Sequence, residues 1–378
     1  MLHEKIRWRI FIASFFIISI LLLSACRSKE GIKIGFVGGL TGNSSEIGVD
    51  GRNAVELAVD EVNKAGGIKG QQIELIIKDD KNDPKVALTV DKELIKNDVK
   101  IIIGHMTSGM TKLTIPLINE ENVLMMSPTI SLDSLTGIED NFLRIIPSNN
   151  SQGDFLANTA FHKNNSKKIA IIYDQRNKAF AEGVIFAFKQ KIEFYGGKIV
   201  IIEIFDNGNN VNYSRITKKI KDSDAEGILV IASSVDAAMF CQHFAKENIN
   251  LPVLMPMWSM TNDLIKQGGP AVEGVYLVSY VDEDSMTLEY SQFRKKYYEK
   301  YQSEPSFASL LSYEATKILF DSMNEVKELT TEAIKENILG KRNFKGLQNE
   351  IVIDQYGDTL RGKYLYQVRN GAFVKVEE

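Results

Sequence analysis

The sequence is poor in the residues that form crosslinks and metal sites. Its 378 residues include two cysteines, Cys26 and Cys241, and four scattered histidines. Cys241 is the only cysteine after Cys26, so the chain beyond Cys26 cannot form an internal disulfide. Without a second nearby cysteine or two histidines at helical ligand spacing, we expect no metal and no cofactor. Stability must come from a buried core, which a chain of this length builds more naturally as two domains than as one.

Positive charge is also scarce. The formal net charge is −4, and removal of residues 1–25, with three basic side chains and one acidic one, would make it about −6. Nucleic acids and anionic membrane surfaces attract concentrated lysine and arginine. We therefore expect neither of them as a partner.

The usual catalytic motifs are missing as well. The sequence has no P-loop, no G-x-S-x-G motif and no neighbouring cysteine and histidine. Its early glycines do not have the G-x-G-x-x-G spacing of a dinucleotide site, and no acidic residue follows about twenty positions later at a strand end. We expect a binding protein and not an enzyme; a hydrolase or transferase on a similar scaffold is a weaker alternative.

The N-terminus has the order of an export signal. Lys5, Arg7 and Arg9 precede the apolar run 10–23, which is too short to cross a bilayer as an ordinary transmembrane helix. Small residues follow this run. We expect a protein that is exported from the cytoplasm.

A lipid-attachment signal closes this segment. Leu-Ser-Ala-Cys at 23–26 resembles a bacterial lipobox, which implies removal of residues 1–25 and acylation of Cys26, with 26–31 as a polar tether. Two acyl chains would suffice for stable anchoring. We expect a lipoprotein on the extracytoplasmic side of the cell membrane or outer membrane. An uncleaved anchor, or an ordinary signal with a chance cysteine, is the alternative.

Predicted strands and helices alternate after residue 31. The run 32–37 is typical of a buried strand, and apolar residues at helical spacing predict a helix over 54–65 that stops at two glycines. Such alternation favours parallel sheets covered by helices on both faces. Further strands are expected at 73–77, 99–103, 123–126, 142–146, 168–173, 199–204, 227–231, 253–255, 275–278, 351–354 and 363–368, and helices at 84–97, 111–121, 180–195, 213–221, 236–247, 288–301, 307–326 and 331–338.

With these elements in place, the chain from Ile32 onward resembles the leucine/isoleucine/valine-binding proteins, the type I periplasmic solute-binding family of branched-chain amino-acid ABC transporters. The resemblance rests on short motifs in family order: Gly39-Leu40-Thr41-Gly42, Ala65-Gly66-Gly67-Ile68-Lys69-Gly70, Asp79-Asp80-Lys81-Asn82-Asp83-Pro84, Gly104-His105-Met106-Thr107-Ser108-Gly109, Met126-Ser127-Pro128-Thr129, Tyr173-Asp174 and Glu304-Pro305-Ser306-Phe307-Ala308.

The resemblance implies an α/β fold with two Rossmann-like lobes, joined by three hinge segments, that enclose a solute. Changes of lobe are expected near residues 148, 280 and 356. The first lobe would comprise 32–148 plus 280–356, and the second 149–279 plus 357–378.

The resemblance also implies ligand contacts in the first lobe. Ser108 opens a helix after a strand, where the family's serine binds the ligand carboxylate; the alternative is a plain N-cap. Thr129 and Ser131 stand where the next strand meets the cleft, and ordinary turn chemistry is the alternative there.

In the second lobe, Phe180 replaces a family tyrosine that closes over the ligand, and helix packing is its alternative. Ser234 replaces a second aromatic residue. Trp258 replaces the acid that pairs with the ligand ammonium, so either another acid substitutes or the ligand has no ammonium. Asp236 is the nearest substitute, although a charge at a helix N-terminus is its more ordinary role. Trp258 could instead serve core packing; lining the cleft, it would favour an apolar or aromatic ligand.

The expected function is capture of an amino acid or related small carboxylate by hinge closure, followed by delivery to an ABC permease. The partners are the solute, the permease and the membrane through the lipid anchor, and the protein should be a monomer. A lipoprotein of the same fold that senses a ligand for a receptor or sensor kinase is the main alternative.

Overall fold

The first lobe is built on a five-stranded parallel sheet. The structure is a computed structural model that describes residues 31–42, 45–206 and 211–377, so the expected signal peptide, Cys26 and nearly all of the tether lie outside the described residues. The strand order is β2-β1-β3-β4-β5, with every pairing parallel. The strands are β1 (Ile32–Gly38), β2 (Ile73–Asp79), β3 (Ile101–Gly104), β4 (Leu124–Ser127) and β5 (Phe142–Arg144).

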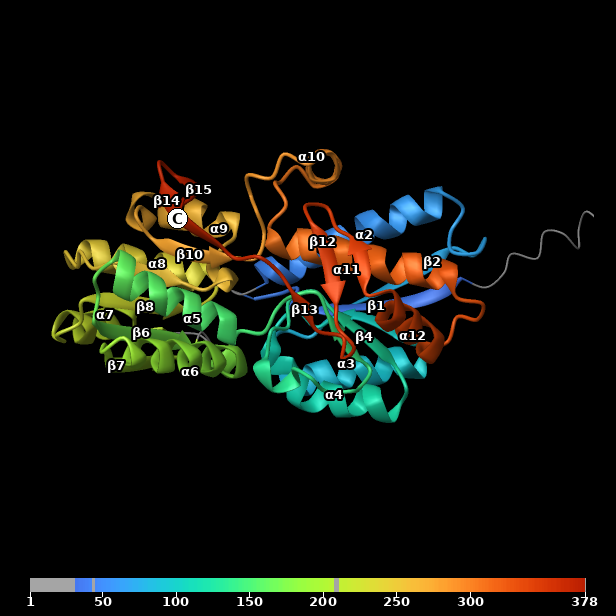
Figure 1. The fold of residues 1–378 in the computed structure, drawn as a ribbon, viewed down its shortest axis with the longest axis horizontal. Helices are drawn as coiled ribbons and strands as arrows, with labels where there is room; N and C mark the ends of the chain where they lie inside the picture. Colours follow the sequence, from blue (N-terminus) through green and yellow to red (C-terminus); the bar gives the residue numbers. More distant parts are fainter. Residues whose placement is uncertain (1–30, 43–44, 207–210, 378) are drawn as a thin grey trace, which may run out of the picture.

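Helices cover both faces of this sheet (Figure 1). Ile34 and Phe36 of β1 pack in one core with α2 and α11, whereas Val37 packs in another with α3 and α4, because successive strand residues point to opposite faces. The helices of this lobe are α2 (Glu46–Lys64), α3 (Pro84–Lys96), η1 (Ser108–Met110), α4 (Thr111–Glu120), η2 (Asp133–Leu135), α10 (Leu288–Tyr301), α11 (Phe307–Glu325) and α12 (Thr331–Lys341).

The second lobe is built on a seven-stranded sheet of order β15-β14-β10-β9-β8-β6-β7. The strands from β10 to β7 are parallel, and β14 and β15 add an antiparallel edge. The strands are β6 (Lys168–Asp174), β7 (Lys198–Phe205), β8 (Gly227–Ile231), β9 (Val253–Met255), β10 (Tyr276–Ser279), β14 (Tyr364–Arg369) and β15 (Ala372–Lys375).

Both faces of this second sheet are also buried. Ile169 and Ile171 of β6 pack on the side of α5 and α6, and Ala170 and Ile172 pack on the side of α7, α8 and α9. The helices are α5 (Asn150–Asn158), η3 (Thr159–Lys163), η4 (Gln175–Asn177), α6 (Lys178–Phe194), α7 (Tyr213–Lys221), α8 (Ser234–Lys246), η5 (Met257–Ser259), α9 (Asn262–Gly268) and η6 (Gly269–Val272).

The chain passes between the lobes three times, after β5, after β10 and before β14. A small antiparallel sheet of β11 (Asn343–Lys345), β12 (Glu350–Ile353) and β13 (Thr359–Leu360) precedes the last passage. The predicted fold class, two α/β lobes with parallel sheets covered by helices, is therefore confirmed. In the parts of the chain that the structure describes, no helix has the length and apolar character needed to span a membrane.

The sequence prediction missed α9, α5 and the start of α2, and the last two share one physical reason. α2 begins at Glu46, eight residues before the predicted start, and α5 was not predicted at all. Both contain glycines, which ordinarily weaken a helix. A Cβ on Gly48 would lie 2.0 Å from the carbonyl oxygen of Gly39, and one on Gly153 would lie 2.4 Å from that of Val184. Close approach of another segment therefore requires glycine at these helical positions.

Candidate functional site

A small cavity lies between the two lobes, at the carboxyl ends of their parallel strands, where ligands of such sheets bind. Its volume is about 30 Å³, enough for about one or two water molecules. A larger ligand fits only if the walls move apart. The cavity is lined by Ile47, Met106, Thr107, Ser108, Thr129, Ser131, Ile146, Gln152, Asn177, Phe180, Met257, Trp258 and Phe307.

Five of the seven residues that the sequence singled out line this cavity: Ser108, Thr129, Ser131, Phe180 and Trp258. They come from both lobes. Their contact with a ligand stays a prediction. The other two, Ser234 and Asp236, lie elsewhere at the start of α8.

Ser108 occupies the first helical position of η1, directly after the loop that follows β3. The N-cap position belongs to Thr107, whose hydroxyl donates to Asn82 Oδ1 at 3.2 Å and does not cap the helix. Ser108 is thus not the N-cap that the alternative interpretation assumed. Its side chain lines the cavity instead.

Thr129 and Ser131 follow β4 and differ in their hydrogen bonding. Thr129 Oγ1 donates to the carbonyl oxygen of Met106 at 2.7 Å, which fixes the loop after β3 against the loop after β4. Ser131 is 1% exposed, and its hydroxyl has no hydrogen-bond partner among the described residues. A buried polar group in this state costs about 1–3 kcal/mol. Ser131 is therefore ready to bond a ligand.

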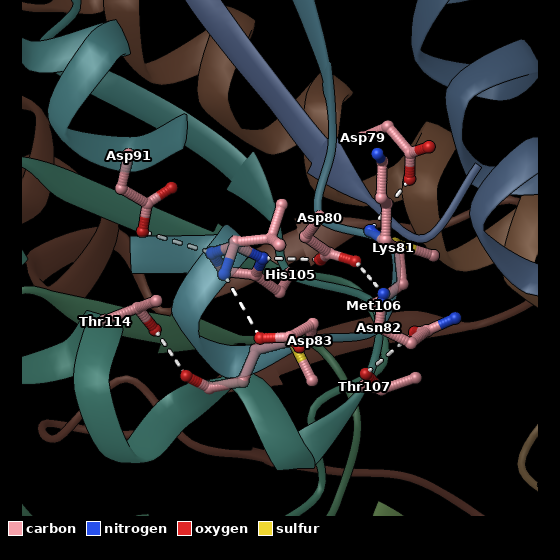
Figure 2. A network of polar contacts seen from close by, with 12 residues as sticks. Asp79, Asp80, Lys81, Asn82, Asp83, Asp91, His105, Met106, Thr107 and Thr114 are labelled. Carbon is pink, nitrogen blue, oxygen red and sulfur yellow. Dashed lines mark hydrogen bonds and ion pairs between the residues drawn. The ribbon is translucent and has the colours of Figure 1, made fainter. Parts of the chain in front are cut away.

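A buried charge network supports the loop that carries Ser108 (Figure 2). His105 is fully buried between two aspartates: Nδ1 contacts Asp80 at 2.7 Å and Nε2 contacts Asp91 at 3.1 Å. Burial opposes the charged imidazole, but the two carboxylates outweigh it and raise the pKa of His105 to about 10. The hydroxyl of Ser127 also donates to the carbonyl oxygen of His105. The loop thus rests on an imidazolium held from both sides.

The second lobe contributes an aromatic wall. The rings of Phe180 and Trp258 meet edge to face, with centroids 5.9 Å apart and an angle of 84°, a favourable geometry for aromatic pairs. The indole N–H of Trp258 has no acceptor among the described residues. Gln152 accepts the backbone N–H of Met257 at 2.9 Å and so fixes η5 beside the cavity.

The two lobes touch directly beside the cavity. The backbone N–H of Gly109 in the first lobe donates to Asn177 Oδ1 in the second at 3.1 Å. A Cβ on Gly109 would lie 2.9 Å from the carbonyl oxygen of Arg176. The two lobes are therefore closed in this structure, and their closure requires glycine, which has no side chain, at position 109.

Ser234 and Asp236 serve α8 and do not line the cavity. Asp236 accepts hydrogen bonds from Tyr213 at 2.6 Å and from Ser233 at 2.9 Å. Ser234 is fully buried, and its hydroxyl has no partner among the described residues. Its backbone donates to the carboxylate of Glu46 from the first lobe. Asp236 therefore has the role that its alternative interpretation predicts, a charge at the N-terminal end of a helix.

Two carboxyl groups at the lobe interface have raised pKa values. Burial raises the pKa of Glu46 from 4.5 to about 7 and that of Asp50 from 3.8 to about 6, and the nearby Asp263 adds to both shifts. Hydrogen bonds from the Ser234 backbone to Glu46 and from Ser306 to Asp50 oppose them. Lys266 also lowers the pKa of Asp50. At a pH between the unfolded and the folded pKa values, Glu46 and Asp50 are thus protonated in the folded protein and ionised in the unfolded chain.

We expect the protein to lose stability as the pH rises from 5 to 8. The folded protein retains protons on Glu46 and Asp50 in this range, whereas the unfolded carboxyls are already ionised, so unfolding is favoured at higher pH. The loss should be on the order of 2 kcal/mol after allowance for partial exposure. Urea unfolding at several pH values measures it. A Glu46→Gln, Asp50→Asn double variant should make the profile shallower, and an unchanged slope would contradict this assignment.

Sequence reasoning missed three polar residues of the cavity wall, Thr107, Gln152 and Asn177. Asn177 follows β6 as Ser108 follows β3, so the rule that ligands lie beyond strand ends could have found it. Gln152 lies on α5, the helix that was not predicted. No sequence signal marked that residue.

Comparison with known proteins identifies the family. The family described as "Periplasmic binding protein" matches residues 31–372. The Leu/Ile/Val-binding protein homolog 1 of Brucella suis is 26% identical over 88% of this chain and 89% of its own length.

Solved structures agree with the fold. The branched-chain amino acid transporter substrate binding protein LivJ of Streptococcus pneumoniae, in complex with isoleucine, is 25% identical, with a TM-score of 0.83 and coverage of 92% of this chain and 100% of that one. A solute binding protein of an ABC transporter from Rhodopseudomonas palustris, in complex with benzoate, has the same TM-score at 19% identity and covers 92% and 95% of the two chains. The chain belongs to the periplasmic binding protein family, within its leucine/isoleucine/valine-binding group.

Proposed function

We propose that the protein is a solute-binding lipoprotein of an ABC importer, tethered through Cys26, that captures a small carboxylate and delivers it to a permease as a monomer. The observation that carries this proposal is the cavity between the lobes, where hydroxyl groups face an apolar and aromatic wall. The relatives support it, since one is a transporter protein in complex with isoleucine and another is in complex with benzoate. Membership of this family also supports an extracytoplasmic location.

Closure would work by differential affinity. The proposed lobes are residues 32–148 plus 280–356 and residues 149–279 plus 357–378, joined at the three passages of the chain. A ligand that contacts Ser108 on one lobe and Trp258 on the other is bound fully only when the lobes meet. It therefore stabilises the closed arrangement by the difference in its affinity for the two states. The closed form is the one that a permease would recognise.

The carboxylate of the ligand would be bound beside Ser108. Ser108 and Ser131 supply hydroxyl donors, and hydrogen bonds to a charged group are stronger than those between neutral groups. Phe180, Trp258 and Phe307 surround the apolar part of the ligand. This arrangement suits a small acid with an apolar or aromatic body.

Ligand binding should raise the melting temperature by mass action. A thermal-shift screen of amino acids, aromatic acids and short peptides should find at least one small carboxylate, and silence across all of them would contradict the proposal.

For the best ligand from this screen, Ser108→Ala should weaken binding by about 1.5–3 kcal/mol, the value of a hydrogen bond to a charged group. Ser291→Ala, on an exposed helical turn, is the matched control. Equal affinities in calorimetry would remove Ser108 from the site.

A further inference from the structure

The cavity wall is rich in donors that have no acceptor. Trp258 is 6% exposed and Ser131 is 1% exposed, and neither the indole N–H nor the hydroxyl has a partner among the described residues. An indole N–H can only donate a hydrogen bond. Buried donors in native structures are normally bonded, so an orphaned one on a residue that lines a binding cavity indicates a missing group. That group is an acceptor on the ligand.

The two amide oxygens on the same wall already accept hydrogen bonds. Gln152 Oε1 accepts the backbone N–H of Met257, and Asn177 Oδ1 accepts that of Gly109. Because the amide oxygens are used in this way, the NH₂ group of each side chain is the part that is left to bond a ligand. The hydroxyls of Thr129 and Thr107 donate their hydrogens to the Met106 carbonyl and to Asn82, so towards a ligand they can only accept. The indole N–H of Trp258 and the amide groups of Gln152 and Asn177 are therefore the donors of the wall.

An ammonium group would find no opposite charge here. Among the described residues, the cavity lining contains no aspartate or glutamate. Asp236 is bonded to Tyr213 and Ser233, and Glu46 lies in a separate groove with Asp50 and Asp263. A cation that loses its water without a counter-charge is bound poorly.

We infer that Trp258 selects acids that present an oxygen acceptor and carry no ammonium group, by donating its indole N–H to that oxygen. This inference rests on the proposed function and narrows its ligand to 2-oxo acids and chemically similar oxygen-bearing acids. Amino acids of the same carbon skeleton are rejected because their ammonium would meet the donor side of the wall.

Matched ligands test this selection. Each common apolar amino acid is compared by calorimetry with its 2-oxo analogue and with the plain acid, for example leucine, 4-methyl-2-oxopentanoate and 4-methylpentanoate. The tightest ligand should be an oxo acid, roughly 100-fold tighter than its amino acid and about tenfold tighter than the plain acid, as expected for one buried donor gaining its acceptor. Trp258→Phe should remove the tenfold preference, so that it weakens the oxo acid about tenfold more than it weakens the plain acid.

Each outcome decides between the proposals. An amino acid as the tightest ligand overturns this inference and leaves the solute-binding function intact. A Trp258→Phe variant that weakens the oxo acid and the plain acid equally overturns the role of the indole N–H. Silence of every acid overturns the proposed function together with this inference.

Discussion

Replacing Gly109 by valine should lower the affinity for any acid bound in the cavity by at least about 100-fold. Even a single Cβ would lie 2.9 Å from the carbonyl oxygen of Arg176 on the opposite lobe, so a branched side chain prevents closure at this point. The hydrogen bond from the Gly109 backbone to Asn177 would be lost with it. Because apparent affinity scales with the fraction of closed molecules, blocking closure weakens binding without touching the cavity wall.

Calorimetry measures the affinity and small-angle scattering the closure. Gly340→Val is the matched control, since Gly340 lies on the exposed side of α12, where a Cβ would have no atom within 4 Å. Both variants should unfold at similar denaturant concentrations. Unchanged affinity in Gly109→Val would show that the closed arrangement is not the one that binds.

Replacing His105 by alanine should cost about 3–5 kcal/mol of unfolding free energy. The imidazolium lies between Asp80 and Asp91, and Asp91 already has one buried oxygen without a partner among the described residues. Without His105, two buried carboxylates face each other with no cation. Urea denaturation at pH 7 measures the loss.

The pH dependence separates this network from simple packing. The pKa of His105 is raised from 6.5 to about 10, so its stabilisation is complete below pH 6.5 and disappears as the pH rises through 10. The difference between the wild type and His105→Ala should therefore shrink progressively between pH 6.5 and 10. His243→Ala, at a partly exposed position, is the control and should change stability little. A loss below 1 kcal/mol in His105→Ala would contradict a charged network.

The strand and helix order was predictable because its signals are local. The predicted helix at 213–221 and strand at 227–231 coincide with α7 and β8. Strands buried on both faces are continuous apolar runs, and the helices between them bury one stripe. The start of α2 and all of α5 were missed because their glycines are required by the close approach of segments that are distant in the sequence.

The candidate site was predictable only in part. Ser108 and Ser131 follow strand ends, which a parallel sheet brings to one edge, so their position at the cavity follows from topology. Asp236 was considered as a replacement for the acid that pairs with the ligand ammonium. Hydrogen bonds from nearby Tyr213 and Ser233 instead hold it on α8. The contact of Asn177 with Gly109 exists only when the lobes meet, and no single-lobe pattern encodes it.

The order of the elements along the chain has a consequence for synthesis. The second sheet gains β14 and β15 from the last residues of the chain, and the first sheet is covered by α11, which follows β10. A nascent chain that has been synthesised as far as β10 therefore has two incomplete hydrophobic cores. Neither core can be completed before the C-terminal segments are synthesised. Truncation cannot yield an intact lobe. Both lobes therefore become complete only after the C-terminal segments have been synthesised.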